Sequence, residues 1–179
     1  MDRIALQRLG YNYDEDSGLL EAAEITGNLI IPRRIFGTFI KHIGHYTFAK
    51  RDLESVVIPQ GILSLGDGAF SSNRIVKLEV PGTVKSIGRF CFNANKLEVV
   101  YLAEGVETIG QEAFGVNYYL RKIFIPPSVV AIAEDAFYDT TDYFEVVCVE
   151  DSYAHNFMKD QAKIKLVTLE EYEESAIAL

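Results

Sequence analysis

The 179-residue sequence predicts a repeat solenoid, in which short coils stack in one direction around a shared core. A branched aliphatic residue followed by a small one recurs at steps of 22, 22, 22 and 23 residues, as Ile43-Gly44, Leu65-Gly66, Ile87-Gly88, Ile109-Gly110 and Ile132-Ala133. A small residue followed by phenylalanine keeps the same steps, with phenylalanine at positions 48, 70, 92, 114 and 137. A unit this short cannot bury its own apolar face, so neighbouring units must cover one another.

Each unit is expected to place one short strand in a parallel sheet on one face of the solenoid. Alternating aliphatic residues mark these strands at 56–58, 78–80, 100–102 and 123–125. Proline follows three of the four triplets and ends the strand, because it cannot donate to a ladder. A second short strand, such as 84–87, is expected on the opposite face. The segment around each phenylalanine predicts a helical or 3₁₀ turn.

The phenylalanines predict a column through the core, one ring per coil, each contributing about 1.5–3 kcal/mol by burial. The residue before each ring must stay small, which gives Cys91 a structural explanation. Asn73, Asn95 and Asn117 each follow a phenylalanine by three residues. We expect these asparagines to turn inward and satisfy backbone groups of adjacent coils, since unpaired buried peptide groups are costly.

The two ends predict caps that cover the terminal coils. Residues 1–26 are expected to form an N-terminal cap with a short helix at 2–9 and an acidic turn at 14–16. The solenoid of about five to six coils is expected over 27–150. Residues 151–179 predict a C-terminal cap with a helix, a strand and an acidic final helix, in which Thr168 and Glu171 form a capping box. The acidic end is alternatively an interaction tail.

The composition argues against several functional classes. The net charge of −9, with 26 acidic against 17 basic residues, disfavours nucleic acid and anionic membrane surfaces as partners. No apolar run approaches the roughly 20 residues of a membrane span, so membrane insertion is not expected. Two cysteines suit a reducing compartment or buried thiols. Because no apolar signal segment is visible, we expect a cytoplasmic protein; the alternative is a cell-surface or secreted one if the chain is trimmed.

The repeated unit resembles the BspA-like leucine-rich repeats, whose unit reads approximately Leu-x-x-Ile-x-Ile-Pro-x-x-Val-x-x-Ile-Gly-x-x-Ala-Phe. Residues 53–70 match nearly position by position, as do 97–114 apart from Ala103. Residues 30–37 resemble the longer first repeat of that family, and 152–167 resemble its closing helix and strand. The resemblance implies a right-handed leucine-rich-repeat coil, adhesin-like, that binds other proteins, often host or cell-surface ones, without catalysis.

Outward positions of the predicted sheet form two columns that suggest a binding site. One column holds Ser55, Lys77, Val99, Lys122 and Val146, and the next holds Val57, Glu79, Tyr101, Phe124 and Cys148. The run Val99, Tyr101, Phe124 and Cys148 is apolar where solvent is expected, which is typical of a partner site. Tyr118, Tyr119 and Tyr143 would extend it along one edge, with Lys122 inside it. Alternatively the cap, or the residue inserted in the longer repeat, covers these side chains.

The favoured function is therefore a non-enzymatic protein-interaction module that uses the sheet face. The alternative is a carbohydrate- or small-ligand-binding adhesin that uses the same aromatic face. A catalytic pair of Cys148 and His155 is the least implausible enzymatic arrangement, and His42 with His45 lacks a third metal ligand. No phosphate-binding loop or zinc motif is present, so no cofactor and no metal are expected.

Overall fold

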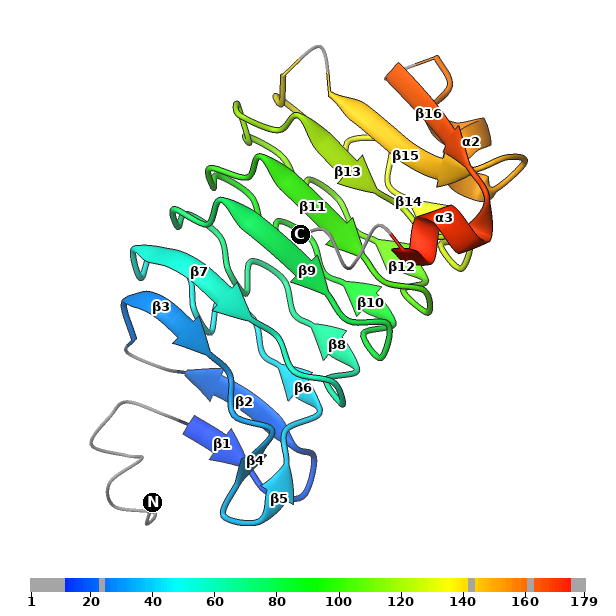
Figure 1. The fold of residues 1–179 in the computed structure, drawn as a ribbon. Helices are drawn as coiled ribbons and strands as arrows, with labels where there is room; N and C mark the ends of the chain where they lie inside the picture. The colour runs from blue at the N-terminus through cyan, green and yellow to red at the C-terminus, as the bar shows by residue number, and fades with distance from the viewer. Residues whose placement is uncertain (1–11, 23–24, 142–143, 161–162, 175–179) are drawn as a thin grey trace.

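The computed structural model describes residues 12–22, 25–141, 144–160 and 163–174. Successive coils stack in one direction and each passes from one sheet to another, which confirms the predicted solenoid (Figure 1). We call the two faces the front and back sheets. The front sheet has five parallel strands, β9 (Lys77–Val80), β11 (Val99–Leu102), β13 (Lys122–Phe124), β15 (Glu145–Val149) and β16 (Lys163–Val167), preceded by the parallel pair β3 (Gly27–Ile30) and β7 (Leu53–Val57).

The back sheet consists of seven short strands in the order β1-β2-β6-β8-β10-β12-β14. Only β1 is antiparallel to its neighbour; the other strands are parallel, one from each successive coil. The strands are β1 (Asn12–Asp14), β2 (Leu19–Ala22), β6 (His42–Ile43), β8 (Ser64–Leu65), β10 (Ser86–Ile87), β12 (Thr108–Ile109) and β14 (Ala131–Ile132). Together the two sheets enclose the apolar core.

The phenylalanine column runs through this core as predicted. Its rings stack nearly parallel, with centroids 5.3, 5.2, 5.8 and 5.7 Å apart from Phe48 to Phe137. The small residue before each of the first four rings is buried, and so is Ala136 before the fifth. Each ring thus contacts its neighbour directly through the space that the small residues leave open.

The segments that carry these rings are turns closed by i to i+3 hydrogen bonds, such as Ala49 N–H to Tyr46 O at 3.1 Å. That bond is the one a 3₁₀ helix uses, but left-handed residues interrupt every segment before a helix forms. Tyr46, Gly68, Phe90 and Glu112 have positive φ at one position of the coil, and Lys50, Ser72, Ala94, Val116 and Asp139 at a second. Two left-handed residues in each of the first four coils, and one in the fifth, therefore bend the chain where a helical turn was expected.

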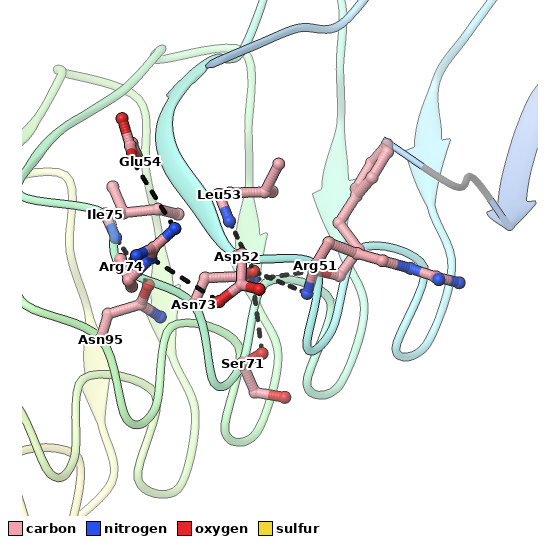
Figure 2. Close-up of polar contacts among 10 residues, drawn as sticks. Arg51, Asp52, Leu53, Glu54, Ser71, Asn73, Arg74, Ile75 and Asn95 are labelled. Carbon is pink, nitrogen blue, oxygen red and sulfur yellow. Dashed lines mark hydrogen bonds and ion pairs between the residues drawn. The ribbon is translucent and has the colours of Figure 1, made fainter. Parts of the chain in front are cut away.

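The predicted asparagine ladder is present, and Figure 2 shows its first two members. The Asn73 side chain donates to the carbonyls of Phe48 and Phe70, both at 2.9 Å, and accepts from Arg51 N–H and Leu53 N–H at 2.9 and 3.1 Å. Asn95 and Asn117 repeat both carbonyl contacts and the contact to the N–H that corresponds to Leu53, one and two coils further on. The ladder thus pairs backbone groups of two coils through one side chain.

Both ends of the described chain carry short elements outside the regular coils. The acidic turn joins β1 to β2, and β2 continues the back sheet, while the helix predicted at 2–9 lies outside the described residues. α2 (Tyr153–Met158) precedes β16, and α3 (Leu169–Glu174) follows it as the last element of the described residues. Thr168 N–H donates to Glu171 at 2.8 Å and Glu171 N–H to Thr168 Oγ1 at 3.2 Å, which confirms the capping box. The predicted division at residues 26 and 150 stays a prediction.

Candidate interaction surface

The outward columns of the front sheet follow the predicted register only as far as β13. Val99 pairs with Lys122, and Tyr101 pairs with Phe124. The next strand places Glu145 beside Lys122 and Val147 beside Phe124, so the positions predicted for Val146 and Cys148 are wrong. The step from β13 to β15 is 23 residues, and a one-residue error moves a side chain to the other face. Cys148 is therefore fully buried in the core.

The aromatic run on the front sheet is covered. Tyr101 is 3% exposed and Phe124 9% exposed, and with Val147 they form a second apolar cluster on the outward side. Val167 of β16 packs against this cluster, and α3 lies against β15. The expectation of exposure is thus wrong for Tyr101, Phe124 and Cys148. The alternative stated above, that the C-terminal cap covers these side chains, is what the structure shows.

Apolar side chains are exposed at the other end of the same column. Ile30 is 73% exposed and Val57 54% exposed, and the two are directly paired across β3 and β7. A groove of about 340 Å³ opens next to them, lined by Val57, Lys77, Glu79 and Val99 among others. Sequence reasoning placed Val57 and Val99 outward but missed the groove and Ile30.

The groove lies where the front sheet is interrupted. Arg74 N–H still donates to Leu53 O at 2.8 Å between these coils. Beyond that bond, no ladder joins β7 to β9 in the described part of the chain. The repeat pattern continues unbroken from 56–58 to 78–80, so the sequence carries no signal of the interruption. The exposure of Ile30 was predictable from the sequence, because Ile30 occupies in β3 the same outward position that Val57 occupies in β7.

The predicted edge tyrosines form a separate exposed feature. Tyr118 and Tyr119 are each 59% exposed and line a recess of about 390 Å³ with Glu98, Arg121 and Thr141. The Tyr118 hydroxyl donates to Asp139 at 2.9 Å. Asn117 keeps its ladder contacts, so the residue inserted in this repeat lies in the Tyr118–Tyr119 pair itself. Tyr143, predicted to extend the edge, lies outside the described residues.

Charged side chains pair between neighbouring coils on the solvated surface. Lys85 contacts Glu107 at 3.1 Å, and Arg121 pairs with Glu98. Lys122, a predicted site residue, contacts Glu145 at 3.0 Å. Such partly exposed pairs contribute a few tenths of a kcal/mol each, so they support the stack only weakly. The Lys122 ammonium group is therefore paired with a carboxylate of the neighbouring front-sheet strand.

Both cysteines are buried, and the three histidine rings form hydrogen bonds with neighbouring residues. Burial raises the pKa of Cys91, and burial likewise raises the pKa of Cys148. The His155 ring accepts Asp151 N–H at 3.1 Å, and no described contact joins it to Cys148. The His42 ring is hydrogen-bonded to the Ser64 hydroxyl, and the His45 ring accepts a hydrogen bond from the Asp67 N–H. Across the described ranges, no three His, Cys, Asp or Glu side chains gather as a metal site would require, and no helix is suited to crossing a membrane.

These features define a repeat protein built from short parallel coils around stacked rings. Residues 34–152 match the BspA type leucine-rich repeat region in six copies, and the chain belongs to this family. No curated protein matches the sequence significantly. The antiparallel pairing of β1 with β2 and the β4–β5 hairpin depart from the regular coil, as does the interruption between β7 and β9.

Three solved structures share the fold. The pneumococcal vaccine antigen PcpA has a TM-score of 0.61 at 16% identity over 79% of this chain and 50% of its own. A leucine-rich repeat protein of T. pallidum has a TM-score of 0.59 at 18% identity, covering 78% and 69%. A leucine-rich cell surface protein from Faecalibacterium prausnitzii has a TM-score of 0.50 at 21% identity, covering 78% and 48%. The chain thus spans about half the length of two of these three structures.

Proposed function

We propose that the protein is a non-enzymatic module that binds a protein partner through the front sheet. The observation that carries the proposal is the exposed pair Ile30 and Val57 beside the groove between β7 and β9. Apolar side chains exposed next to a groove are typical of partner sites, because a partner can bury them at little cost. The proposed site thus moves from the predicted aromatic run toward the N-terminal half of the sheet.

The chemistry of the groove supports a polypeptide partner. Its lining is mainly aliphatic, and Lys77 and Glu79 add one charge of each sign. Protein interfaces combine an apolar centre with a polar rim in this way. Val99, which the sequence places in the apolar run of the sheet face, also lines the groove, whereas Tyr101 and Phe124 pack between the sheet and the cap.

Replacing both Ile30 and Val57 by lysine is expected to remove partner binding without unfolding the protein, because both side chains point to solvent. The measurement is affinity capture from the source organism, comparing proteins retained by the wild type and by each variant. The matched control replaces Leu63 and Val130 by lysine, since both are exposed apolar residues that precede back-sheet strands. A double variant at Ile30 and Val57 that retains the same proteins as the wild type would contradict the proposal.

The tyrosine edge favours a second candidate function, carbohydrate binding. Exposed aromatic rings stack on the apolar face of a sugar ring, and nearby polar groups bond its hydroxyls. Tyr118 and Tyr119 lie at a recess that also presents Glu98, Arg121 and Thr141. Both elements of a sugar site are therefore present at one edge of the solenoid.

Replacing Tyr119 by alanine is expected to abolish saturable binding to any glycan that the wild type retains on a glycan array. Tyr138 provides the control, since its exposure is nearly equal and it does not line the recess. If the wild type binds no glycan, or if the Tyr119 and Tyr138 variants behave alike, this second candidate is rejected.

A further inference from the structure

A β-hairpin is inserted into the first coil of the solenoid. Seven residues, 33–39, separate Pro32 from Ile40, whereas the next coil has two residues between Pro59 and Ile62. The added residues form β4 (Arg34–Ile35) and β5 (Thr38–Phe39), an antiparallel pair at the N-terminal end of the stack (Figure 1). Phe36 and Gly37 between them both have positive φ, as a tight two-residue hairpin turn requires.

The hairpin is anchored in the core by Ile35 and receives a hydrogen bond of 3.1 Å from the Tyr13 hydroxyl at Phe39 O, and most of its other side chains face solvent. Ile35 is buried in the main core, while Arg33, Arg34, Phe36 and Phe39 are exposed. The Arg34 guanidinium lies 3.9 Å from the centre of the Phe39 ring. Stacking on a ring fixes the guanidinium plane and leaves its edge N–H groups free for a planar acceptor. Insertions in repeat proteins commonly gather on the binding face.

The charge of this segment is opposite to that of the protein. Residues 25–51 contain five lysines and arginines and no aspartate or glutamate, in a chain whose net charge is −9. In the described part of the chain, Arg33 and Arg34 form no ion pair, whereas Arg74, Lys85, Arg121, Lys122 and Lys163 all do. The nearby β1–β2 turn is acidic, but the Asp14 carboxylate accepts the N–H and hydroxyl of Ser17.

We propose that the β4–β5 hairpin is a docking site for a short acidic segment of a protein partner. Arg33 and Arg34 would take its carboxylates, with Arg34 positioned by Phe39, and Phe36 and Phe39 would cover an apolar side chain next to them. The strongly acidic remainder of the chain disfavours a long polyanion such as nucleic acid, because repulsion extends over a whole bound polymer. A short segment contacts only the hairpin. The inference is independent of the front-sheet proposal.

The test measures fluorescence anisotropy of a labelled peptide against the full chain. The probe has the sequence of residues 168–175, which combines four glutamates with a leucine and a tyrosine. We expect saturable binding that weakens with salt, and about a tenfold loss when the four glutamates become glutamine. Arg34→Glu is expected to cause a similar loss. Lys96→Glu is the matched control, because Lys96 is exposed and its side chain has no described partner.

A conservative variant distinguishes binding to a specific arginine geometry from general attraction between opposite charges. Arg34→Lys keeps the charge but loses the planar fork and its stacking, so we expect at least about a threefold loss of affinity. Equal affinity of Arg34→Lys and the wild type would overturn the site, as would equal affinity for the glutamate and glutamine peptides. A loss on Lys96→Glu as large as on Arg34→Glu would also overturn it. Circular dichroism of each variant verifies that the fold is kept.

Discussion

Replacing Phe92 by alanine is expected to lower the free energy of unfolding by about 3–5 kcal/mol. Phe92 lies in the middle of the column, fully buried, with Phe70 and Phe114 stacked at 5.2 and 5.8 Å. Neighbouring rings cannot close the resulting gap, because each is held in register by its own coil. The loss is large beside the roughly 5–15 kcal/mol that stabilises most folded domains.

Urea unfolding followed by circular dichroism and by tyrosine fluorescence measures this effect, and coincident transitions would establish that a two-state analysis applies. Phe137→Ala is the control within the same column. Phe137 is only partly buried at the C-terminal end, so a smaller loss is expected there. A Phe92→Ala variant that loses less than about 1 kcal/mol, or no more than Phe137→Ala, would show that the column is not the main source of stability.

The repeat was predictable because core positions recur with the same residue types. A coil can place its phenylalanine, small residue and asparagine only where the neighbouring coils place theirs, so the sequence period directly reports the stacking. The register of β15 was not predictable in the same way. Residues 138–144 carry none of the repeat's marker residues, so the sequence predicts a step of 24 residues between β13 and β15 where the structure has 23.

The candidate site was predictable only in part, because exposure depends on contacts between distant segments. Tyr101 points outward as its strand period requires, yet the cluster it forms is packed against Val167, 66 residues later in the chain. No local pattern around Tyr101 reports that contact. The arginine pair of the hairpin is different, since the excess of five basic residues over 25–51 is visible in the sequence and only its placement needed the structure.

Replacing Asn95 by alanine is expected to lower the free energy of unfolding by about 1–3 kcal/mol, although it removes only one short polar side chain. The Asn95 side chain donates to Phe70 O at 2.9 Å and to Phe92 O at 3.1 Å, and it accepts Ile75 N–H at 3.1 Å. Alanine would leave Ile75 N–H without its acceptor, whereas Phe70 O keeps the Asn73 side chain as a donor and Phe92 O keeps that of Asn117. An unpaired buried polar group costs about 1–3 kcal/mol, and the Ile75 N–H sets the expected loss.

Asn93→Ala is the matched control, two residues away on the same turn. The Asn93 side chain is partly exposed and donates to Glu112 at 3.3 Å, so water can replace that bond and a loss below about 0.5 kcal/mol is expected. Urea unfolding of the two variants side by side measures the difference. If Asn95→Ala were as stable as Asn93→Ala, the asparagine ladder would be a consequence of the coil geometry and not one of its causes. If the expected gap is found, each coil is stabilised by two columns that differ in chemistry, one of stacked rings and one of shared hydrogen bonds.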